Sequence, residues 1–287
     1  MPSSLTHVPA LPAMGVGILL RALFKRPQHP LPGSPPELAS SYRLDGLPLD
    51  DIALYRAAFG FEGEHIPLTW WYLLAQRAHL ATMLAPGFPF RIVGLVHMDN
   101  ALRTHRTPAP GRPLLIDTVL RLLPPSSSGA LRCVLETTGS SDGAPVFSCS
   151  STYLIRRGSR GSAKQEQPVT PQGAPLAQWS LGSDAGRRYA RLSGDWNPIH
   201  LTRWSARLMG MRAPIIHGMH TLASACAALE RAAGRPLLAI DCRFRAPVAL
   251  GKSVELFFDA ESEEFVVAAA GKPAVTGSIA PTTPLSS

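Results

Sequence analysis

The sequence has little cysteine and little charge, and each shortage excludes a class of protein. Only four cysteines occur among 287 residues, and they are widely separated with no CxxC pair. A disulfide framework and a cysteine-based metal site are therefore not indicated, and a reducing compartment, the cytoplasm, is expected. No phosphate-binding loop or HExxH motif is present either, which removes the commonest signatures of nucleotide-binding proteins and zinc proteases.

A long hydrophobic run is also missing. The apolar stretch MGVGILLRALF, residues 14–24, is far shorter than the ~20 residues that a membrane helix needs. Its positive charges follow the apolar part, whereas those of a signal peptide precede it. We expect a packed or surface-lying helix here, and no membrane span.

Charged residues make up only 17% of the chain, but positive ones predominate. The 28 Lys and Arg residues against 20 Asp and Glu give a formal net charge of +8, and 45% of the residues are hydrophobic. The chain can therefore bury a sizeable core. The positive excess indicates either a solvated basic surface or an anionic partner. Because the basic residues form no long block and no aromatic nucleic-acid motif accompanies them, a phosphorylated small molecule is favoured over nucleic acid.

Two stretches rich in Pro, Gly, Ser and polar residues divide the chain. The first, residues 25–41, is predicted to be an extended linker, and the second covers residues 156–175. The lengths between and after them predict two domains of similar size. The expected organisation is an N-terminal apolar segment and linker over residues 1–41, a first domain over 42–157, a linker over 158–178 and a second domain over 179–287.

The two domains share one order of elements. Each begins with a long apolar helix, predicted over residues 66–84 and 213–234, with Gly234 as the stop of the second. Strand-like runs follow each helix, for example LLIDTVLRLL at residues 114–123 and EFVVAAAG at 264–271. This repeated order predicts an α+β duplication in which each antiparallel sheet wraps around a long central helix.

The segment YARLSGDWNPIH, residues 189–200, concentrates an acid, an amide and an imidazole in one turn. Gly194 permits a tight turn, and the proline after Asn197 restricts that residue to extended conformations. Asp195 and His200 can then face one cleft, where a carboxylate and an imidazole can take a proton from water and deliver one elsewhere. A plain loop with an Asx turn is the alternative interpretation.

The segment PIIHGMH, residues 214–220, places Gly218 at the start of the second long helix. The first N–H groups of a helix lack internal partners and lie at the positive end of its dipole, so they suit a carbonyl oxygen that gains negative charge. An acid, an imidazole and a helix N-terminus are the parts of an enolate-forming site. His217 and His220 are interpreted as capping or packing residues, because an HxxH pair without a further ligand is a poor zinc site.

The segment YARLSGDWNPIHLTRWSA, residues 189–206, resembles the signature of the MaoC-like, (R)-specific enoyl-CoA hydratases. Every position of that signature is met, APIIHGMH is similar to the family's second motif, and RFRAPVALGKSVEL resembles its later strand pair. The resemblance is strong over residues 179–284 and loose over 42–157. It implies a tandem, or double, hot-dog fold and the reversible hydration of trans-2-enoyl-CoA to (3R)-3-hydroxyacyl-CoA.

The resemblance also implies roles for particular residues. Asp195 would activate water, His200 would exchange the proton at the α-carbon, and the Gly218 N–H would hold the thioester oxygen. The supporting residues would be Asn197, which braces the loop, and Ser224 or Cys226, one or two helical turns beyond the glycine. No metal or redox cofactor is implied, since the thioester itself acidifies the α-proton.

The first domain lacks this motif, so one active site per chain is expected. Aligning the two long helices puts Trp71 near the position of Gly218, and we expect Trp71 to contribute to an apolar wall for the acyl chain. Glu64 and His65 lie nearby in the wrong order and are interpreted as structural. The candidate residues for binding CoA are the basic ones of the second domain, Arg212, Arg243, Arg245 and Lys252.

Several alternatives remain open at the level of sequence. The carrier of the acyl group is either CoA, present as part of the substrate, or an acyl carrier protein, and the chain is either a monomer or a homodimer. A hot-dog acyl-CoA thioesterase is the rival enzyme, because the same Asp and water could attack the carbonyl. A non-catalytic acyl-thioester-binding subunit is the rival from another class.

Overall fold

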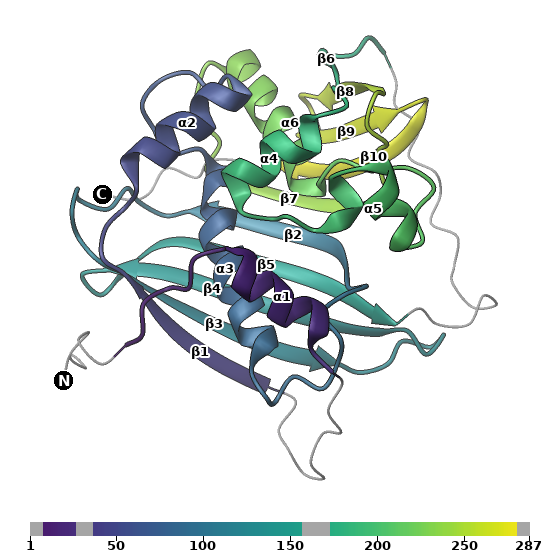
Figure 1. Ribbon diagram of the computed structural model, residues 1–287. Helices are drawn as coiled ribbons and strands as arrows, with labels where there is room; N and C mark the ends of the chain where they lie inside the picture. Colours follow the sequence, from purple (N-terminus) through teal and green to yellow (C-terminus); the bar gives the residue numbers. More distant parts are fainter. Residues whose placement is uncertain (1–7, 27–36, 157–172, 280–287) are drawn as a thin grey trace. The chain divides into compact units, whose positions relative to one another are not determined.

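The computed structural model describes residues 8–26, 37–156 and 173–279. The chain forms two compact units. The first comprises Met1–Leu49 and Trp71–Gln165, and the second Asp50–Trp70 and Glu166–Ser287. Each unit combines one antiparallel sheet with one long buried helix (Figure 1), so the predicted α+β duplication is confirmed.

The sheet of the first unit has five strands in the order β1-β3-β4-β5-β2, and all neighbours are antiparallel. Alternation along β3 turns Leu114, Ile116 and Leu120 into the core, as the period of two in a half-buried strand requires. The strands are β1 (Glu37–Leu44), β2 (Val96–Thr104), β3 (Leu114–Leu123), β4 (Leu131–Ser141) and β5 (Ala144–Arg156).

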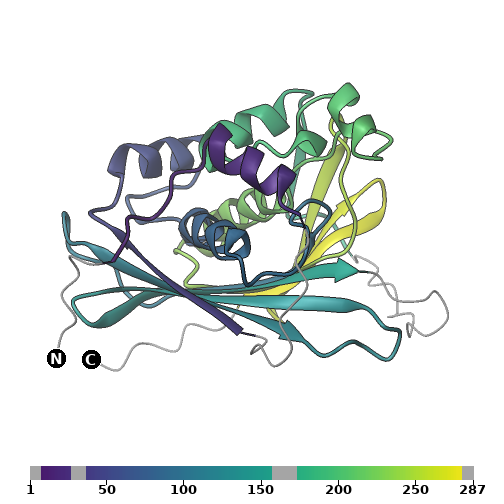
Figure 2. The same ribbon diagram turned by 60° about the horizontal axis from the view of Figure 1, so that its bottom comes forward.

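The central helix of the first unit, α3 (Trp71–Leu84), lies across one face of this sheet and contacts β1, β3, β4 and β5 (Figure 2). Most of its residues are buried, and apolar side chains accordingly lie on most sides of the helix and not in a single stripe. At its first residue, the fully buried Trp71 ring stacks on Phe147 with 4.9 Å between centroids and 12° between planes. A Cβ on Gly139 would overlap the Phe147 ring, so this glycine makes room for the stack.

A short helix, α1 (Val16–Phe24), packs against α3. It occupies the apolar N-terminal stretch for which a helix was expected. Among the residues that the structure describes, none of the helices has both the length and the apolar character needed to cross a bilayer.

The sheet of the second unit has the order β7-β10-β9-β8-β6, again antiparallel throughout. Its central helix, α6 (Gly218–Ala233), is mostly buried and ends at Gly234, whose left-handed φ of 64° stops the helix at the expected residue. The strands are β6 (Ala177–Ser180), β7 (Ala239–Phe244), β8 (Ser253–Asp259), β9 (Glu264–Ala269) and β10 (Lys272–Ile279).

The described part of the second unit also contains the helical segments α2 (Leu49–Phe59, all but its first residue), η2 (Leu68–Trp70), α4 (Ala185–Ser193), η3 (Pro198–His200) and α5 (Arg203–Leu208). Phe59 of α2 packs its ring against Tyr189 of α4 with 6.0 Å between centroids. Nearby, His65 lies 2.9 Å from the buried carboxylate of Glu230 on α6, a contact that fits the structural role expected for His65.

The expected domain limits differ from the structure at three places. The first linker was expected to reach residue 41, but residues 37–41 form the start of β1, which pairs with β3. The second linker was expected to reach residue 178, which lies inside β6. Residues 50–70 were expected in the first domain, but their contacts with α4 and α6 assign them to the second unit.

Candidate active site

The loop between α4 and η3 is held by its own polar side chains. Gly194 ends α4 with a left-handed φ of 72°, and the Ser193 hydroxyl then accepts a hydrogen bond from the Asp195 N–H. The Asp195 carboxylate accepts from the Asn197 N–H at 3.1 Å, and the Asn197 side chain accepts from the Ile199 N–H at 3.3 Å. The dense run of polar residues therefore fixes the backbone that carries Asp195 and His200.

A close approach between α4 and η3 places His200. A Cβ on Gly186 of α4 would overlap the His200 carbonyl, so only glycine allows the two segments to lie this close. The His200 imidazole is buried, and its Nδ1–H donates to the Ile215 carbonyl at 2.9 Å. Since a carbonyl can only accept, the proton sits on Nδ1 and the lone pair of neutral His200 sits on Nε2.

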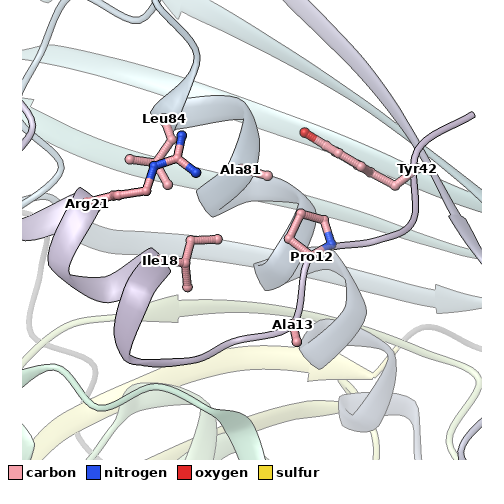
Figure 3. Close-up of a pocket in the computed structure, with 7 residues that line it drawn as sticks. All are labelled: Pro12, Ala13, Ile18, Arg21, Tyr42, Ala81 and Leu84. Atoms are coloured by element: carbon pink, nitrogen blue, oxygen red, sulfur yellow. The ribbon is translucent and has the colours of Figure 1, made fainter.

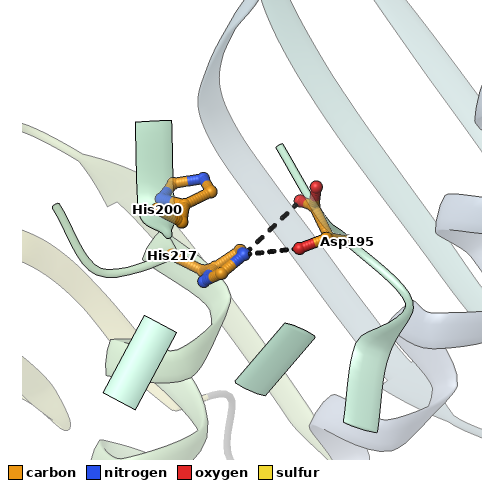
Figure 4. Close-up of side chains that lie close together, drawn as sticks. All are labelled: Asp195, His200 and His217. Carbon is orange, nitrogen blue, oxygen red and sulfur yellow. Dashed lines mark hydrogen bonds and ion pairs between the residues drawn. The ribbon is translucent and has the colours of Figure 1, made fainter. Parts of the chain in front are cut away.

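His217, the residue before α6, completes a cluster with Asp195 and His200 (Figure 4). Its Nε2–H donates to the Asp195 carbonyl at 3.0 Å and lies 4.0 Å from the Asp195 carboxylate. Its ring stacks on the His200 ring with 3.6 Å between centroids and 28° between planes. The structure therefore brings the two motifs of the sequence together at one place.

Burial keeps the imidazoles of this region neutral. It lowers the pKa of His200, although the negative charge of Asp195 and the hydrogen bond to Ile215 oppose the shift. Burial, aided by the adjacent His200, lowers the pKa of His217 to about 3. A neutral imidazole with a free lone pair can act as a base, so His200 is ready to take a proton.

The interpretation of His217 as a capping or packing residue is wrong in part. Its side chain makes no capping hydrogen bond to α6 and instead contacts Asp195 and His200. His220 does pack, with its ring 5.2 Å from that of Phe59 and 5.6 Å from that of Tyr189. The signal that could have found His217 is its place directly before the glycine that starts the helix.

Gly218 is the first residue of α6 and lies exposed at the helix start. Helix geometry gives its N–H no partner within α6. A Cβ on this residue would lie 2.8 Å from the Phe244 ring, so a larger side chain would force that ring to move. The position therefore offers an N–H donor at a place where only glycine fits without rearrangement.

The possible metal-ligand atoms of Asp195, His200 and His217 lie within 4.8 Å of one another, so the geometry has to be compared with that of a metal site. Stacked rings direct their in-plane lone pairs side by side, whereas a metal needs lone pairs that converge on one point. The nitrogen of His217 that faces Asp195 also carries the proton donated to the Asp195 carbonyl. The arrangement suits proton transfer better than metal binding.

The match to known families falls on this part of the chain. The family model for the MaoC-like domain matches residues 160–268, which include all three residues of the cluster. The chain carries a MaoC-like dehydratase domain.

Known relatives extend the similarity beyond the MaoC-like domain. The chain is 28% identical over 222 residues to 3-hydroxyacyl-thioester dehydratase X of Mycobacterium tuberculosis, covering 75% of this chain and 78% of that protein. It is 29% identical over 160 residues to peroxisomal enoyl-CoA hydratase 2 of Arabidopsis thaliana, covering 50% of this chain and 52% of that protein. The crystal structure of HtdX from Mycobacterium tuberculosis superposes with a TM-score of 0.69 at 26% identity, covering 83% of this chain and 98% of that one. The fold is a double hot-dog, as expected.

The two residues expected to support Asp195, Ser224 and Cys226, lie on α6 and have other surroundings. The Ser224 hydroxyl donates to the His220 carbonyl one helical turn earlier, at 3.1 Å. Cys226 is fully buried in α6, and burial raises the pKa of its thiol. The Asp195 carboxylate is instead held by the backbone of its own loop.

The residues expected to bind substrate are spread over several segments. Trp71 belongs to the core of the first unit. The basic candidates lie in the loop before His217, on and after β7, and before β8, and Arg245 donates to the Thr276 hydroxyl at 3.1 Å. In the order of the chain they are Arg212, Arg243, Arg245 and Lys252.

Proposed function

We propose that the MaoC-like domain catalyses the reversible hydration of trans-2-enoyl thioesters to (3R)-3-hydroxyacyl thioesters. The observation that supports this proposal most is the pairing of a carboxylate with a neutral imidazole whose Nε2 lone pair is free. Addition of water to an activated double bond requires a group that orients water and a group that moves a proton. The named activities of the relatives, dehydration of 3-hydroxyacyl thioesters and hydration of enoyl-CoA, point the same way.

In the hydration direction, the Asp195 carboxylate accepts a hydrogen bond from water and orients its oxygen toward C3. The Nε2 atom of His200 takes a proton from that water as the new C3–O bond forms. The electron pair of the C2–C3 double bond moves toward the thioester oxygen, and His200 then returns the proton to C2. Dehydration follows the same steps in reverse, and neither direction consumes or releases a net proton.

The charges that develop during this reaction have neighbours of opposite sign. Asp195 stabilises the transient imidazolium of His200, which agrees with its opposing effect on the pKa of that group. The Gly218 N–H, at the positive end of α6, donates to the thioester oxygen as it gains negative charge. His217 holds the Asp195 carbonyl and covers one face of His200, so we assign it a positioning role.

The carrier is proposed to be CoA or an acyl carrier protein, and four basic residues, Arg212, Arg243, Arg245 and Lys252, are the candidates for its phosphates. Surface charge attraction is screened beyond a Debye length of about 8 Å at physiological ionic strength. The KM for a CoA substrate should therefore rise with salt, while a salt-independent KM would remove these residues from substrate capture.

The cytoplasm is kept as the expected compartment, although the Arabidopsis thaliana relative is named peroxisomal.

Product analysis tests this function against its rivals. Purified protein supplied with crotonyl-CoA should form (3R)-3-hydroxybutyryl-CoA, identified by chiral chromatography, without releasing free thiol. Free CoA as the main product would indicate a thioesterase, and binding without turnover would indicate a non-catalytic subunit. Because no metal takes part in the proposed steps, dialysis against EDTA should leave the rate unchanged.

A further inference from the structure

The helix α1 carries apolar side chains on two faces. Its inner face packs on α3 and includes the buried Ala22. Its outer face exposes Leu20 by 47%, Leu23 by 41% and Phe24 by 73%. Single exposed apolar residues are ordinary, but three within five consecutive residues of one helix form a patch that packing within the first unit does not explain.

The segment that contains α1 is tied to the first unit at both ends. Before the helix, the Leu11 N–H donates to the Arg43 carbonyl of β1 at 2.7 Å, and Arg77 of α3 donates to the Leu11 and Pro12 carbonyls at 2.9 and 2.8 Å. After the helix, the Lys25 ammonium donates to the Ala85 carbonyl at 2.8 Å. The outer face is therefore presented in a fixed orientation.

The surface around α1 is hollowed and positively charged. One pocket of about 260 Å³ lies between α1, α3 and β1, with Arg21 and Ile18 on its α1 side (Figure 3). A second, of about 360 Å³, is lined by Arg21, Phe24, Lys25 and Arg26 together with Leu84 and Pro86.

Among the residues that the structure describes, the arginines at α1 have no acidic partner. The sequence contains no Asp or Glu before Glu37. Arg21 and Arg26 are exposed, and within the described ranges no acidic side chain pairs with either one. The patch therefore combines apolar side chains with unbalanced positive charge.

We propose that α1 docks the protein on the surface of an anionic phospholipid bilayer. Leu20, Leu23 and Phe24 enter the boundary between headgroups and acyl chains, and Arg21 and Arg26 contact lipid phosphates. Helices that combine exposed Leu and Phe with Lys or Arg bind such interfaces, and a small helix binds them weakly and reversibly.

The charge of the patch favours lipid over a second copy of this chain. A symmetric contact would bring the same arginines of two copies together, which is unfavourable. The apolar face also consists of three side chains, whereas a stable dimer buries roughly 800 Å² on each partner. An anionic bilayer satisfies both the apolar and the charged part of the patch.

Co-sedimentation of the full chain with vesicles tests the proposal. We expect binding to vesicles of phosphatidylcholine mixed with phosphatidylglycerol, little binding to phosphatidylcholine alone, and weakening with salt. The double variant Arg21→Gln/Arg26→Gln should lose affinity by about fivefold for each arginine removed. Leu20→Gln/Phe24→Gln should lose about tenfold or more.

The helix α5 supplies control variants. Its side chains of Trp204 and Leu208, exposed by 74% and 67%, have the same four-residue spacing as Leu20 and Phe24, and Arg203 and Arg207 each directly precede one of them. The variants Trp204→Gln/Leu208→Gln and Arg203→Gln/Arg207→Gln should sediment with anionic vesicles as the wild type does. Thermal midpoints of all four variants, which alter exposed residues, should match the wild type.

Three results would overturn the proposal. One is wild-type protein that does not prefer anionic vesicles, a result that needs no variant. Another is equal loss of binding in the α1 and α5 variants. The third is a concentration-dependent dimer in size-exclusion chromatography that only the α1 variants abolish, which would assign the patch to a second copy. Hydration of soluble crotonyl-CoA by the α1 variants is expected to stay unchanged, so failure of this proposal is distinguishable from failure of the proposed function.

Discussion

His217 contacts both groups to which catalysis is assigned, and it does so through two different interactions. Its Nε2–H donates to the Asp195 carbonyl, and its ring face lies on His200. With a pKa lowered to about 3 by burial, it stays neutral near pH 7. These contacts can be removed separately by substitution.

We expect His217→Phe to keep the ring contact and lose the hydrogen bond, while His217→Gln keeps a donor and loses the ring. Loss of a hydrogen bond to a neutral group costs about 0.5–1.5 kcal/mol, so kcat should fall roughly two- to tenfold in the Phe variant. KM should change little, because His217 positions other residues and does not hold the substrate. A Phe variant with wild-type kcat would show that the hydrogen bond has no role in turnover.

Asp195 and His200 could be proposed from the sequence because both lie in one turn, where local rules apply. The contact of His217 could not be predicted in this way, since its partner Asp195 lies 22 residues away along the chain. That contact depends on where the loop before α6 runs, which is set by tertiary packing such as the hydrogen bond from Ile215 to Ile199. Neither spacing nor periodicity reports such a contact.

At the scale of elements, α3 and α6 begin at corresponding residues, Trp71 and Gly218, as the alignment of the two halves predicted. At the first residue of α3, the large Trp71 ring stacks on Phe147. At the first residue of α6, Gly218 has no side chain to cover its N–H donor. The two central helices therefore begin with residues of different chemistry, although each lies in the same kind of fold.

The proposed role of Trp71 in acyl-chain selection can be separated from its role in the core. Trp71→Ala should lower the free energy of unfolding by about 3–5 kcal/mol, because the side chain is fully buried. Trp71→Phe keeps an aromatic ring against Phe147 and should shift the ratio of hydration rates toward long enoyl-CoA substrates. A series of chain lengths measures this ratio, and a uniform change across the series would leave Trp71 as core alone.

Short runs rich in apolar residues made most strands predictable. The run LLIDTVLRLL is β3 residue for residue, and EFVVAAAG contains all of β9. The structure differs where the pattern is weak or interrupted. The strand β1 directly follows a proline-rich stretch, and α2 buries only Ile52 and Tyr55, which is too little periodicity to identify a helix.

At the scale of the whole molecule, buried neutral histidines occur in both units. Burial lowers the pKa of His79 and His97 in the first unit to about 3, and that of His217 and His220 in the second to about 3 and 4. Each has an ordinary pKa of 6.5 when unfolded. The unfolded chain therefore binds more protons than the folded one between these values.

Stability should consequently fall as the pH drops below about 6.5, by up to about 1.4 kcal/mol per pH unit for each such histidine. Chemical unfolding at about pH 7 and about pH 5 measures the difference. The variant His79→Gln, which removes one of these groups, should show a smaller pH dependence than the wild type. An equal or larger free energy of unfolding at the lower pH would contradict this account.

The division into units was the part of the fold least accessible from sequence. Two units of similar size follow from the linkers, but the assignment of residues 50–70 to the second unit depends on contacts between distant segments. Phe59 against Tyr189 and His65 against Glu230 are such contacts. No local signal marks a segment that leaves one domain to complete another.

The most direct test of the central claim follows the absorbance of crotonyl-CoA with wild-type protein and the variants Asp195→Asn and His200→Ala. The wild type should remove the absorbance of the conjugated double bond. His200→Ala should be slower by about 10²–10⁴-fold, since a general acid–base group typically contributes that much. Asp195→Asn should also be much slower, because it removes the negative charge that stabilises the transient imidazolium of His200. Both variants should have thermal midpoints that show folded protein. A folded variant that hydrates crotonyl-CoA at a near-normal rate would contradict the role given to that residue.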